Sequence, residues 1–384
     1  MSEWPIVKLG ELLKPSPKKT AGELDAPILS ITMHDGLVEQ GTRFKKRIAS
    51  LDTSIYRIVF KGQLVVGFPI DEGVLDFQDK YSQALVSPAY GVWDLVSDEV
   101  TPEFLGLFLK SPRAISIYKS RLRGTTARRR SLPTKVFQEI EFPLPPLGEQ
   151  KRIAEILGGA SKAINEIRTE IKRVESLCGA VVSLYAEDQS TKKLEDLATL
   201  SGGLSLGSHR KNKPHSVGYL RVANVFWGKI LYDEIKELNC TDQEFERTLL
   251  QDGDVLITEA HANRFQVGRS AVFRGEEQAL VFQNHLFRAR PNKNIDSDVL
   301  AAMLSSVAVR RQLYQMTKTT SGLNTISISQ VRSLRVPVLD TTKQAELLSF
   351  LQESNKLNYL LHRKLSLLQE LQKSLANRAF AGLL

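Results

Sequence analysis

The stretch FPLPPLGEQKRIAEIL, residues 142–157, combines an apolar segment, a proline pair and the start of a periodic apolar run. A related stretch, VPVLDTTKQAELLSFL, stands 194 residues later at 336–351. The positions that coincide at this offset include Pro143 and Pro337, Gln150 and Gln344, and Leu157 and Leu351. The pattern predicts, twice in one chain, a strand that is followed by a turn and a helix.

The similarity continues upstream, with an offset that drifts by a few residues. The paired segments are VKLGEL (7–12) with KKLEDL (192–197), ILSIT (28–32) with YLRVA (219–223), and KGQLVVG (61–67) with DGDVLIT (252–258). Loop insertions in a duplicated unit produce such a drift. One repeat of about 190 residues is far longer than a solenoid repeat and is large enough to bury its own core. The sequence therefore predicts two tandem domains.

Each repeat ends in a heptad pattern of apolar residues, which predicts a long helix. The first seam comprises Ile153, Leu157, Ala160, Ile164, Ile167, Ile171, Val174, Cys178, Val181 and Tyr185. The second comprises Leu347, Leu351, Ser354, Asn358, Leu361, Leu365, Leu368, Gln372, Leu375 and Ala379, with three polar interruptions. We expect globular domains at 1–147 and 189–340 and spacer helices at 148–188 and 341–384. The helices pack on each other, parallel or antiparallel, unless each only covers its own domain.

Composition limits the class of protein. With 42% hydrophobic and 25% charged residues the chain is an ordinary globular one, and it has no apolar run long enough for a membrane helix and no signal-peptide core. We therefore expect a cytoplasmic protein without a membrane partner. Two cysteines are too few for a disulfide framework. The net charge of +9 favours a polyanionic partner.

Basic loops rich in turn-forming residues recur in both repeats. They are KPSPKKTAG (14–22), TRFKKR (42–47) and RLRGTTARRR (121–130) in the first repeat, and GSHRKNKPH (207–215), HANRFQVGR (261–269) and MTKTTSGLNT (316–325) in the second. Arginine, asparagine and histidine side chains suit base edges and phosphates. The alternatives are a solvated surface, or a contact with a protein or with the phosphate backbone alone.

The sequence offers little for catalysis. The histidines lack zinc-ligand spacing, and no nucleophile elbow or methyltransferase motif is present. Asp233, Glu234 and Lys236 resemble a nuclease carboxylate-lysine trio, but the first repeat has no counterpart. We therefore predict a non-catalytic chain with no metal and no cofactor of its own.

At this level of detail the chain resembles the specificity subunit of Type I restriction-modification enzymes. PLPPLGEQKRIAEIL (143–157) opens the first long helix, and a decayed copy opens the second. The segments of the second repeat that resemble the family's target recognition domains are KLEDLATLSGG (193–203), YLRVANVFWGKI (219–230), LQDGDVLITEA (250–260), VGRSAVF (267–273) and FQNHLFRAR (282–290). The first repeat has the looser counterparts WPIVKLGELL (4–13), KGQLVVG (61–67) and LVSPAYGVWDL (85–95).

The resemblance implies an α+β fold, with two tandem α/β target recognition domains joined by two long helices in an antiparallel, pseudo-twofold coiled coil. It implies that each domain reads one half of a bipartite, asymmetric double-stranded DNA site, and that the coiled coil sets the spacing. It also implies two methyltransferase subunits that bring S-adenosylmethionine, and endonuclease/translocase subunits that use ATP and Mg²⁺. LDTTKQAELL (339–348) departs from the proline-rich opening of the first helix, so the two docking sites need not be equivalent.

The predicted DNA-binding residues are Arg43, Lys45, Lys46, Arg128, Arg129 and Arg130 in the first repeat, and His209, Arg210, Lys211, Asn263, Arg264, Asn284, His285 and Lys318 in the second. Two other classes stay open. A coiled-coil scaffold protein would bind DNA only weakly even with its partners. A nuclease acting alone would depend on a divalent metal and on Asp233, Glu234 or Lys236.

Overall fold

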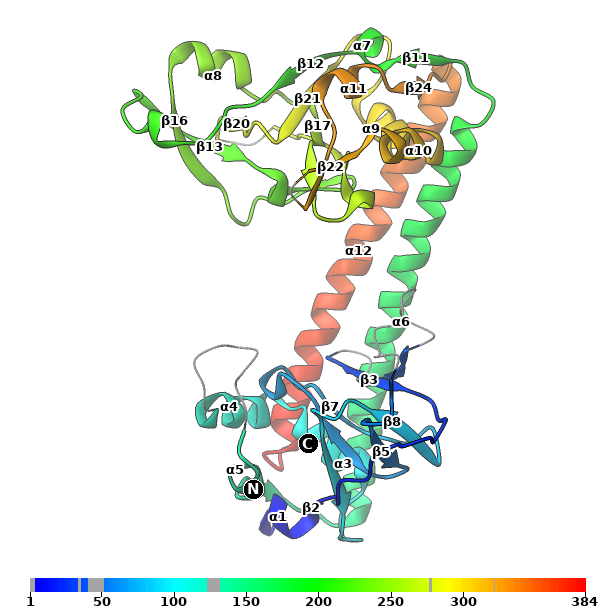
Figure 1. Cartoon of the computed structure of the whole chain (residues 1–384), viewed down its shortest axis with the longest axis vertical. Helices are drawn as coiled ribbons and strands as arrows, with labels where there is room; N and C mark the ends of the chain where they lie inside the picture. The colour runs from blue at the N-terminus through cyan, green and yellow to red at the C-terminus, as the bar shows by residue number, and fades with distance from the viewer. Residues whose placement is uncertain (1–3, 34–35, 41–51, 123–131, 276–277, 321) are drawn as a thin grey trace. The chain divides into compact units, whose positions relative to one another are not determined.

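The computed structural model describes residues 4–33, 36–40, 52–122, 132–275, 278–320 and 322–384. The chain forms two compact units, which are described separately: unit 1 is Met1–Arg168 with Arg363–Leu384, and unit 2 is Thr169–His362. Two long helices, α6 (Leu147–Ala186) and α12 (Thr341–Ala379), each contribute one part to either unit (Figure 1). Among the described residues, no helix is long and apolar enough to span a membrane.

Unit 1 is built around a four-stranded sheet with the order β2-β9-β6-β7. Leu64 of β6 pairs with Trp93 of β9, and Leu64 also pairs with Phe77 of β7. The elements of the unit before α6 are β1 (Ile6–Lys8), α1 (Leu9–Leu12), β2 (Leu13–Pro15), β3 (Leu29–Thr32), β4 (Gly36–Glu39), β5 (Arg57–Phe60), β6 (Leu64–Val66), the 3₁₀ helix η1 (Ile70–Glu72), β7 (Leu75–Phe77), β8 (Gln83–Val86), β9 (Gly91–Leu95), α3 (Pro102–Leu109), α4 (Pro112–Arg121), α5 (Thr134–Gln138) and β10 (Glu141–Pro143).

Unit 2 repeats this sheet with the order β12-β21-β17-β19 and adds two three-stranded sheets, β16-β13-β20 and β18-β23-β22. Its elements between the long helices are β11 (Thr191–Lys193), α7 (Leu194–Leu197), β12 (Ala198–Gly202), η3 (Ser208–Arg210), β13 (His215–Leu220), η4 (Val222–Asn224), β14 (Val225–Phe226), β15 (Lys229–Ile230), β16 (Lys236–Cys240), α8 (Asp242–Thr248), β17 (Val255–Thr258), β18 (Ala260–His261), η5 (Arg264–Gln266), β19 (Ser270–Val272), β20 (Leu280–Phe282), β21 (Leu286–Pro291), α9 (Ser297–Ser305), α10 (Val307–Met316), β22 (Lys318–Thr320), β23 (Leu323–Thr325), α11 (Ile328–Arg332) and β24 (Arg335–Pro337).

The duplication predicted from the sequence is confirmed by the strand pairing. In unit 1, β1 pairs with β10 through Val7 and Phe142, and in unit 2, β11 pairs with β24 through Lys192 and Val336. The strand that precedes each long helix therefore closes back on the first strand of its own repeat. A parallel pairing is also kept in both copies, because β13 pairs with β20 parallel and, in unit 1, Ile28 just before β3 forms a parallel bridge with Leu85 of β8.

The two long helices pair antiparallel, which confirms the coiled coil. In unit 1 the Gln372 side-chain amide near the end of α12 donates to the Ser161 hydroxyl in the first half of α6, at 2.7 Å. In unit 2 the Tyr185 hydroxyl at the end of α6 donates to the Glu346 carboxylate near the start of α12, at 3.2 Å. Of the predicted seam residues, those with buried side chains are Ile153, Leu157, Ile164, Ile171, Val174, Leu347 and Ala379. Those partly buried are Ala160, Ile167, Cys178, Val181, Tyr185, Leu351, Ser354, Asn358, Leu361, Leu365, Leu368, Gln372 and Leu375.

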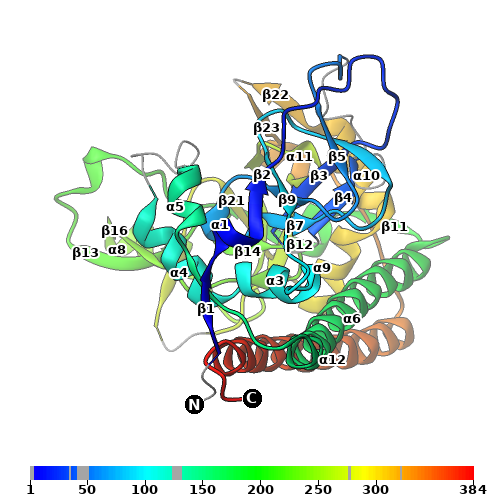
Figure 2. The same ribbon diagram turned by 90° about the horizontal axis from the view of Figure 1, so that it is seen from below.

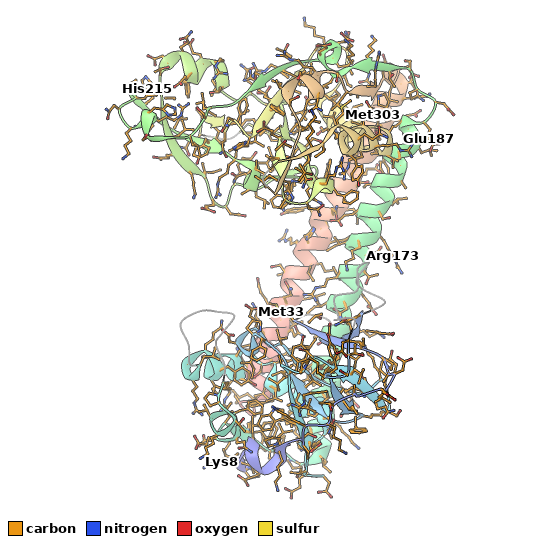
Figure 3. The ribbon with its side chains drawn as sticks, viewed as in Figure 1. Lys8, Met33, Arg173, Glu187, His215 and Met303 are labelled. Carbon is orange, nitrogen blue, oxygen red and sulfur yellow. The ribbon has the colours of Figure 1, made fainter. Side chains whose placement is uncertain are left out.

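The end of each long helix completes a globular core. In unit 1, Phe380 lies just beyond α12 and packs on Phe104 and Phe108 of α3, with ring centroids 5.6 and 5.3 Å apart. In unit 2, Val182 near the end of α6 belongs to the same buried cluster as Met303 of α9, which Figure 3 labels. Each unit is therefore stabilised by the helix that closes it as well as by its own repeat.

The glutamine shared by both helix openings fixes the helix to its domain. Gln150 is fully buried; its amide donates to the Glu99 and Pro145 carbonyls at 2.7 and 2.8 Å, and its side-chain oxygen accepts the Thr101 N–H at 2.9 Å. Thr101 is the N-cap of α3, which lies beside the start of α6 in Figure 2. Gln344 makes the equivalent bond to the N-H of Asp296, the N-cap of α9, at 3.3 Å. The Gln of the opening motif is therefore a docking residue.

Candidate nucleic-acid interface

The predicted DNA-contact residues of the first repeat lie outside the described residues. These are Arg43, Lys45, Lys46, Arg128, Arg129 and Arg130. The eight predicted residues of the second repeat are all described, and they fall into two groups in unit 2.

The larger group is built on the small sheet β18-β23-β22. His261 of β18 pairs with Asn324 of β23, and Lys318 of β22 pairs with Thr325. The buried Asn324 amide donates to the Ala262 carbonyl at 2.9 Å, and its oxygen accepts the Thr319 hydroxyl at 2.9 Å. This side chain joins two loops that are some 60 residues apart in sequence. We call residues 260–266, 316–319 and 322–325 the β18–β22 surface.

Asn263, Arg264 and Lys318 lie together on the β18–β22 surface. The Asn263 side chain is exposed and caps η5 by accepting the Phe265 N–H at 3.0 Å. The Arg264 guanidinium donates to the Thr317 carbonyl at 3.0 Å and lies 4.2 Å from the Tyr314 ring centroid. Because Thr317 directly precedes Lys318, this hydrogen bond holds the loop that contains Arg264 next to Lys318, whose side chain is exposed.

The turn containing Asn284 and His285 is tied to the same surface. The His285 Nδ1 lies 2.6 Å from the Glu259 carboxylate, and the Glu259 N–H donates to the His285 carbonyl at 3.0 Å. The Glu259 carbonyl in turn accepts the Ile326 N–H at 3.0 Å, directly after β23. The structure thus gathers Asn263, Arg264, Asn284, His285 and Lys318 around one small sheet.

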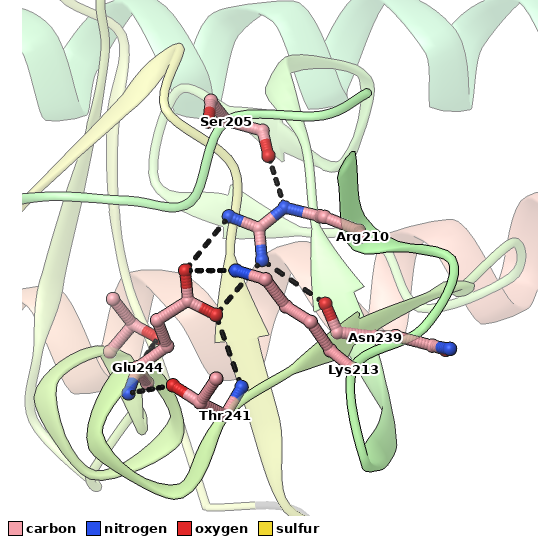
Figure 4. Close-up of polar contacts among 7 residues, drawn as sticks. Ser205, Arg210, Lys213, Asn239, Thr241 and Glu244 are labelled. Atoms are coloured by element: carbon pink, nitrogen blue, oxygen red, sulfur yellow. Dashed lines mark hydrogen bonds and ion pairs between the residues drawn. The ribbon is translucent and has the colours of Figure 1, made fainter. Parts of the chain in front are cut away.

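The smaller group surrounds η3, and there the role of Arg210 needs correction. Its side chain is only 7% exposed and donates to the Ser205 and Asn239 carbonyls and to the Glu244 carboxylate (Figure 4). Because all of these contacts lie within the protein, the Arg210 guanidinium positions the loop around η3 and is not free to contact DNA. Its neighbours His209 and Lys211 are exposed and keep their candidacy.

Glu244 is the centre of this partly buried cluster. Its carboxylate accepts from Lys213 at 2.6 Å and from the Thr241 N–H at 3.1 Å, besides the contact with Arg210. These donors, the Lys213 ammonium first among them, lower the pKa of Glu244 to about 2. The carboxylate is therefore ionised at neutral pH and holds η3 to the N-terminus of α8. Strand β13 begins beside this cluster at His215, labelled in Figure 3.

The distribution of charge along the sequence points to further basic residues, which lie outside the predicted basic loops. Between Asp298 and Asp340 no acidic residue occurs, and the basic residues there are Arg310, Arg311, Lys318, Arg332 and Arg335. The corresponding segment of the first repeat, between Glu103 and Glu139, also lacks acids and carries Lys110, Arg113, Lys119, Arg121, Arg123, Arg128, Arg129, Arg130 and Lys135. An acid-free basic segment at the same place in both repeats is a signal for a polyanion. Arg310 and Arg311 of α10 therefore join the candidates.

Of the residues on which a nuclease acting alone would depend, Glu234 forms ion pairs with basic side chains of this protein. Glu234 pairs with Arg221 at 2.6 Å and lies 3.8 Å from Lys236. The Glu234 side chain is 69% exposed, so these are surface ion pairs. Within the described part of the chain, no group of three or more His, Cys, Asp or Glu side chains has the arrangement of a metal site.

Comparisons with known proteins confirm the predicted family resemblance. Residues 1–176 match the family described as Type I restriction modification DNA specificity domain. The chain is 26% identical over 306 residues to the Type I restriction enzyme EcoKI specificity subunit of Escherichia coli (strain K12), and 20% identical over 307 residues to the StySPI specificity subunit of Salmonella potsdam. These alignments cover 73% and 74% of this chain and 65% of each relative, so the chain spans about two thirds of the length of either relative.

A solved structure supports the fold. A chain from a study of complex assembly and conformational transition of the type I R-M system superposes with a TM-score of 0.61 at 17% identity, covering 100% of this chain and 99% of the other. At this identity the likeness concerns the fold alone. It covers both repeats and both long helices.

Proposed function

We propose that this chain, which belongs to the specificity subunits of Type I restriction-modification enzymes, is the DNA sequence-recognition subunit of such an enzyme. Each unit reads one half of a bipartite, asymmetric site in double-stranded DNA, and the coiled coil sets the number of bases between the halves. At about 1.5 Å per residue, the 40-residue helix α6 is about 60 Å long. That length compares with nearly two turns of B-DNA at about 34 Å each.

The observation that carries this proposal is the repetition of one basic segment on two copies of one fold. The sheets β2-β9-β6-β7 and β12-β21-β17-β19 have the same order, and in each copy the segment without acidic residues follows the start of the helix that packs on that sheet. A scaffold for proteins has no need of the same cationic segment in both copies. Two basic segments in one chain, each able to contact a polyanion, suit binding to the two half-sites of one DNA duplex.

We further propose that the exposed apolar side chains of the long helices dock methyltransferase subunits. Leu177 and Leu184 of α6 are exposed and seven residues apart, so they lie on one helix face. On α12, Leu357, Leu360, Leu367 and Leu371 are exposed at spacings of three, seven and four residues. Such stripes beside an already paired seam suit further helices that pack on the coiled coil.

Catalysis would then belong to the partners. S-adenosylmethionine would be bound by the methyltransferase subunits, and ATP and Mg²⁺ by endonuclease/translocase subunits. In this proposal the chain contributes DNA contacts and the geometry that places the methyltransferases, with no metal or cofactor of its own.

Base-resolution methylation sequencing tests the proposal. DNA would come from cells that carry this gene together with the methyltransferase gene that the proposal expects beside it, and from a control in which only this gene is deleted. We expect a split motif methylated on adenine, which is lost on deletion. An unchanged methylation pattern, with an active methyltransferase present, would refute the proposed function and favour the scaffold alternative.

A further inference from the structure

An aromatic side chain protrudes from the β18–β22 surface. Phe265 in η5 is 60% exposed, and its ring stacks on Tyr314 of α10 with centroids 5.1 Å apart and an interplanar angle of 23°. Eight other phenylalanines among the described residues are buried in the cores, and a large apolar side chain at a loop tip exposes surface that water solvates poorly. The position of Phe265 is therefore better explained by contact with a ligand than by folding.

Two arginine side chains hold the Phe265 loop in place. The Arg310 guanidinium donates to the Phe265 carbonyl at 2.6 Å and lies 3.9 Å from the Trp227 ring centroid. Arg264, the residue before Phe265, contacts the Tyr314 ring and the Thr317 carbonyl. These cation-π and hydrogen-bond contacts fix the backbone on both sides of the ring. The ring is thus presented without the entropic cost of ordering a loose loop.

The chemistry around Phe265 selects the ligand. Arg264, Arg310 and Lys318 are all basic, and the acidic residue that precedes β18, Glu259, is paired with His285. A protruding aromatic ring amid cations suits DNA, in which phosphates meet the cations and bases offer apolar faces and thymine methyl groups.

We infer that Phe265 contacts a base of the DNA half-site read by unit 2 and helps to determine which base is accepted there. This inference rests on the proposed function and names one of its specificity-determining residues. The corresponding loop of unit 1 also exposes a phenylalanine, Phe68, just before η1, but it carries Asp71 and Glu72. The inference is therefore confined to unit 2.

The test uses the full chain assembled with its methyltransferase and a duplex that contains the motif found by methylation sequencing. Phe265→Ala should weaken binding to this duplex by roughly 5- to 150-fold, the factor that corresponds to one lost base–aromatic contact. Its salt dependence should stay as in the wild type, because no charge is removed. Methylation in cells should then extend to sites that differ at one position of one half-site.

The matched control is Val307→Ala, which truncates an exposed apolar side chain on the same helix as Tyr314 and Arg310. It should bind DNA as the wild type does. If the wild-type complex binds no specific duplex, both the proposed function and this inference fail. If the wild type binds and Phe265→Ala binds equally well with an unchanged motif, only this inference fails. Unchanged DNA affinity with weaker association of the methyltransferase would overturn it in favour of a protein contact.

Discussion

Replacing Phe380 by alanine should destabilise unit 1 selectively. Phe380 lies beyond the end of α12, is 2% exposed, and contributes its ring to a cluster with Phe104 and Phe108. The Phe108 and Phe380 rings meet at 82°, an edge-to-face contact. The backbone around the ring is also held, because Arg113 donates to the Phe380 carbonyl at 3.2 Å. The substitution would remove the ring and leave this backbone in place, so the site would collapse only partly.

The expected magnitude follows from burial and geometry. Truncation of a buried phenylalanine to alanine costs about 3–5 kcal/mol, which includes the cavity that remains. The edge-to-face pair accounts for about 0.5–1.5 kcal/mol of that cost. Because a domain is stable by only about 5–15 kcal/mol, the variant should bring unit 1 close to unfolding. Unit 2 closes its core with Val182 of α6 and should keep its stability.

Hydrogen exchange followed by mass spectrometry measures both units in one sample. Peptides from α3 and α4 report unit 1, and peptides from α9 and α10, their counterparts, report unit 2. We expect faster exchange only in the first pair. Tyr359→Ala is the control, since this aromatic residue on α12 is 65% exposed and its loss should change little. Equal acceleration in both units, or none in unit 1, would refute the closure of unit 1 by the end of α12.

Three further substitutions test the docking of α6 by Gln150, the cluster around Glu244 and the β18–β22 surface. Gln150→Ala removes a fully buried side chain and leaves the partly buried Thr101 N–H without its partner, so it should destabilise unit 1 by about 1–3 kcal/mol in urea unfolding. Gln344→Ala should destabilise unit 2 by less, because Gln344 is only partly buried. The pKa of Glu244 is lowered from 4.5 to about 2, so its ionised form stabilises the fold above pH 4.5 and this contribution is lost as the pH falls toward 2. The difference in unfolding free energy between the wild type and Glu244→Gln should therefore shrink between pH 4.5 and pH 2. A difference that stays constant over this range would contradict a stabilising role of the Glu244 carboxylate. Lys318→Ala should weaken binding to all duplexes and reduce the salt dependence by about one ion, and an unchanged slope would exclude a phosphate contact.

Much of the fold is encoded in local sequence patterns. The heptad spacing and the proline pair before Leu147 predict the long helices. The segments that recur in both repeats predict the duplicated strands. The polar residue Gln372 interrupts the second seam, and the sequence gives no reason for it. The structure does, because Ser161 accepts its hydrogen bond and the pair fixes the register of the antiparallel helices.

The candidate site could be predicted only in part, because contacts distant in sequence assemble it. Arg210 resembles a surface cation, but Glu244, 34 residues later, draws it into the protein. Asn324 joins loops that no local pattern links. Arg310 lies on an amphipathic helix, where its role with Trp227 and Phe265 depends on tertiary packing. The absence of acidic residues along this segment was the signal in the sequence that pointed to it.

In the proposed function, the two units read the two halves of a DNA site independently. The most direct test of this independence exchanges residues 189–340 for the corresponding segment of a relative with a different target and maps methylated adenines at base resolution in cells that carry the methyltransferase. We expect one half of the split motif to change, while the other half and the number of bases between them stay the same. Changes in both halves, or a motif that is unchanged, would contradict it.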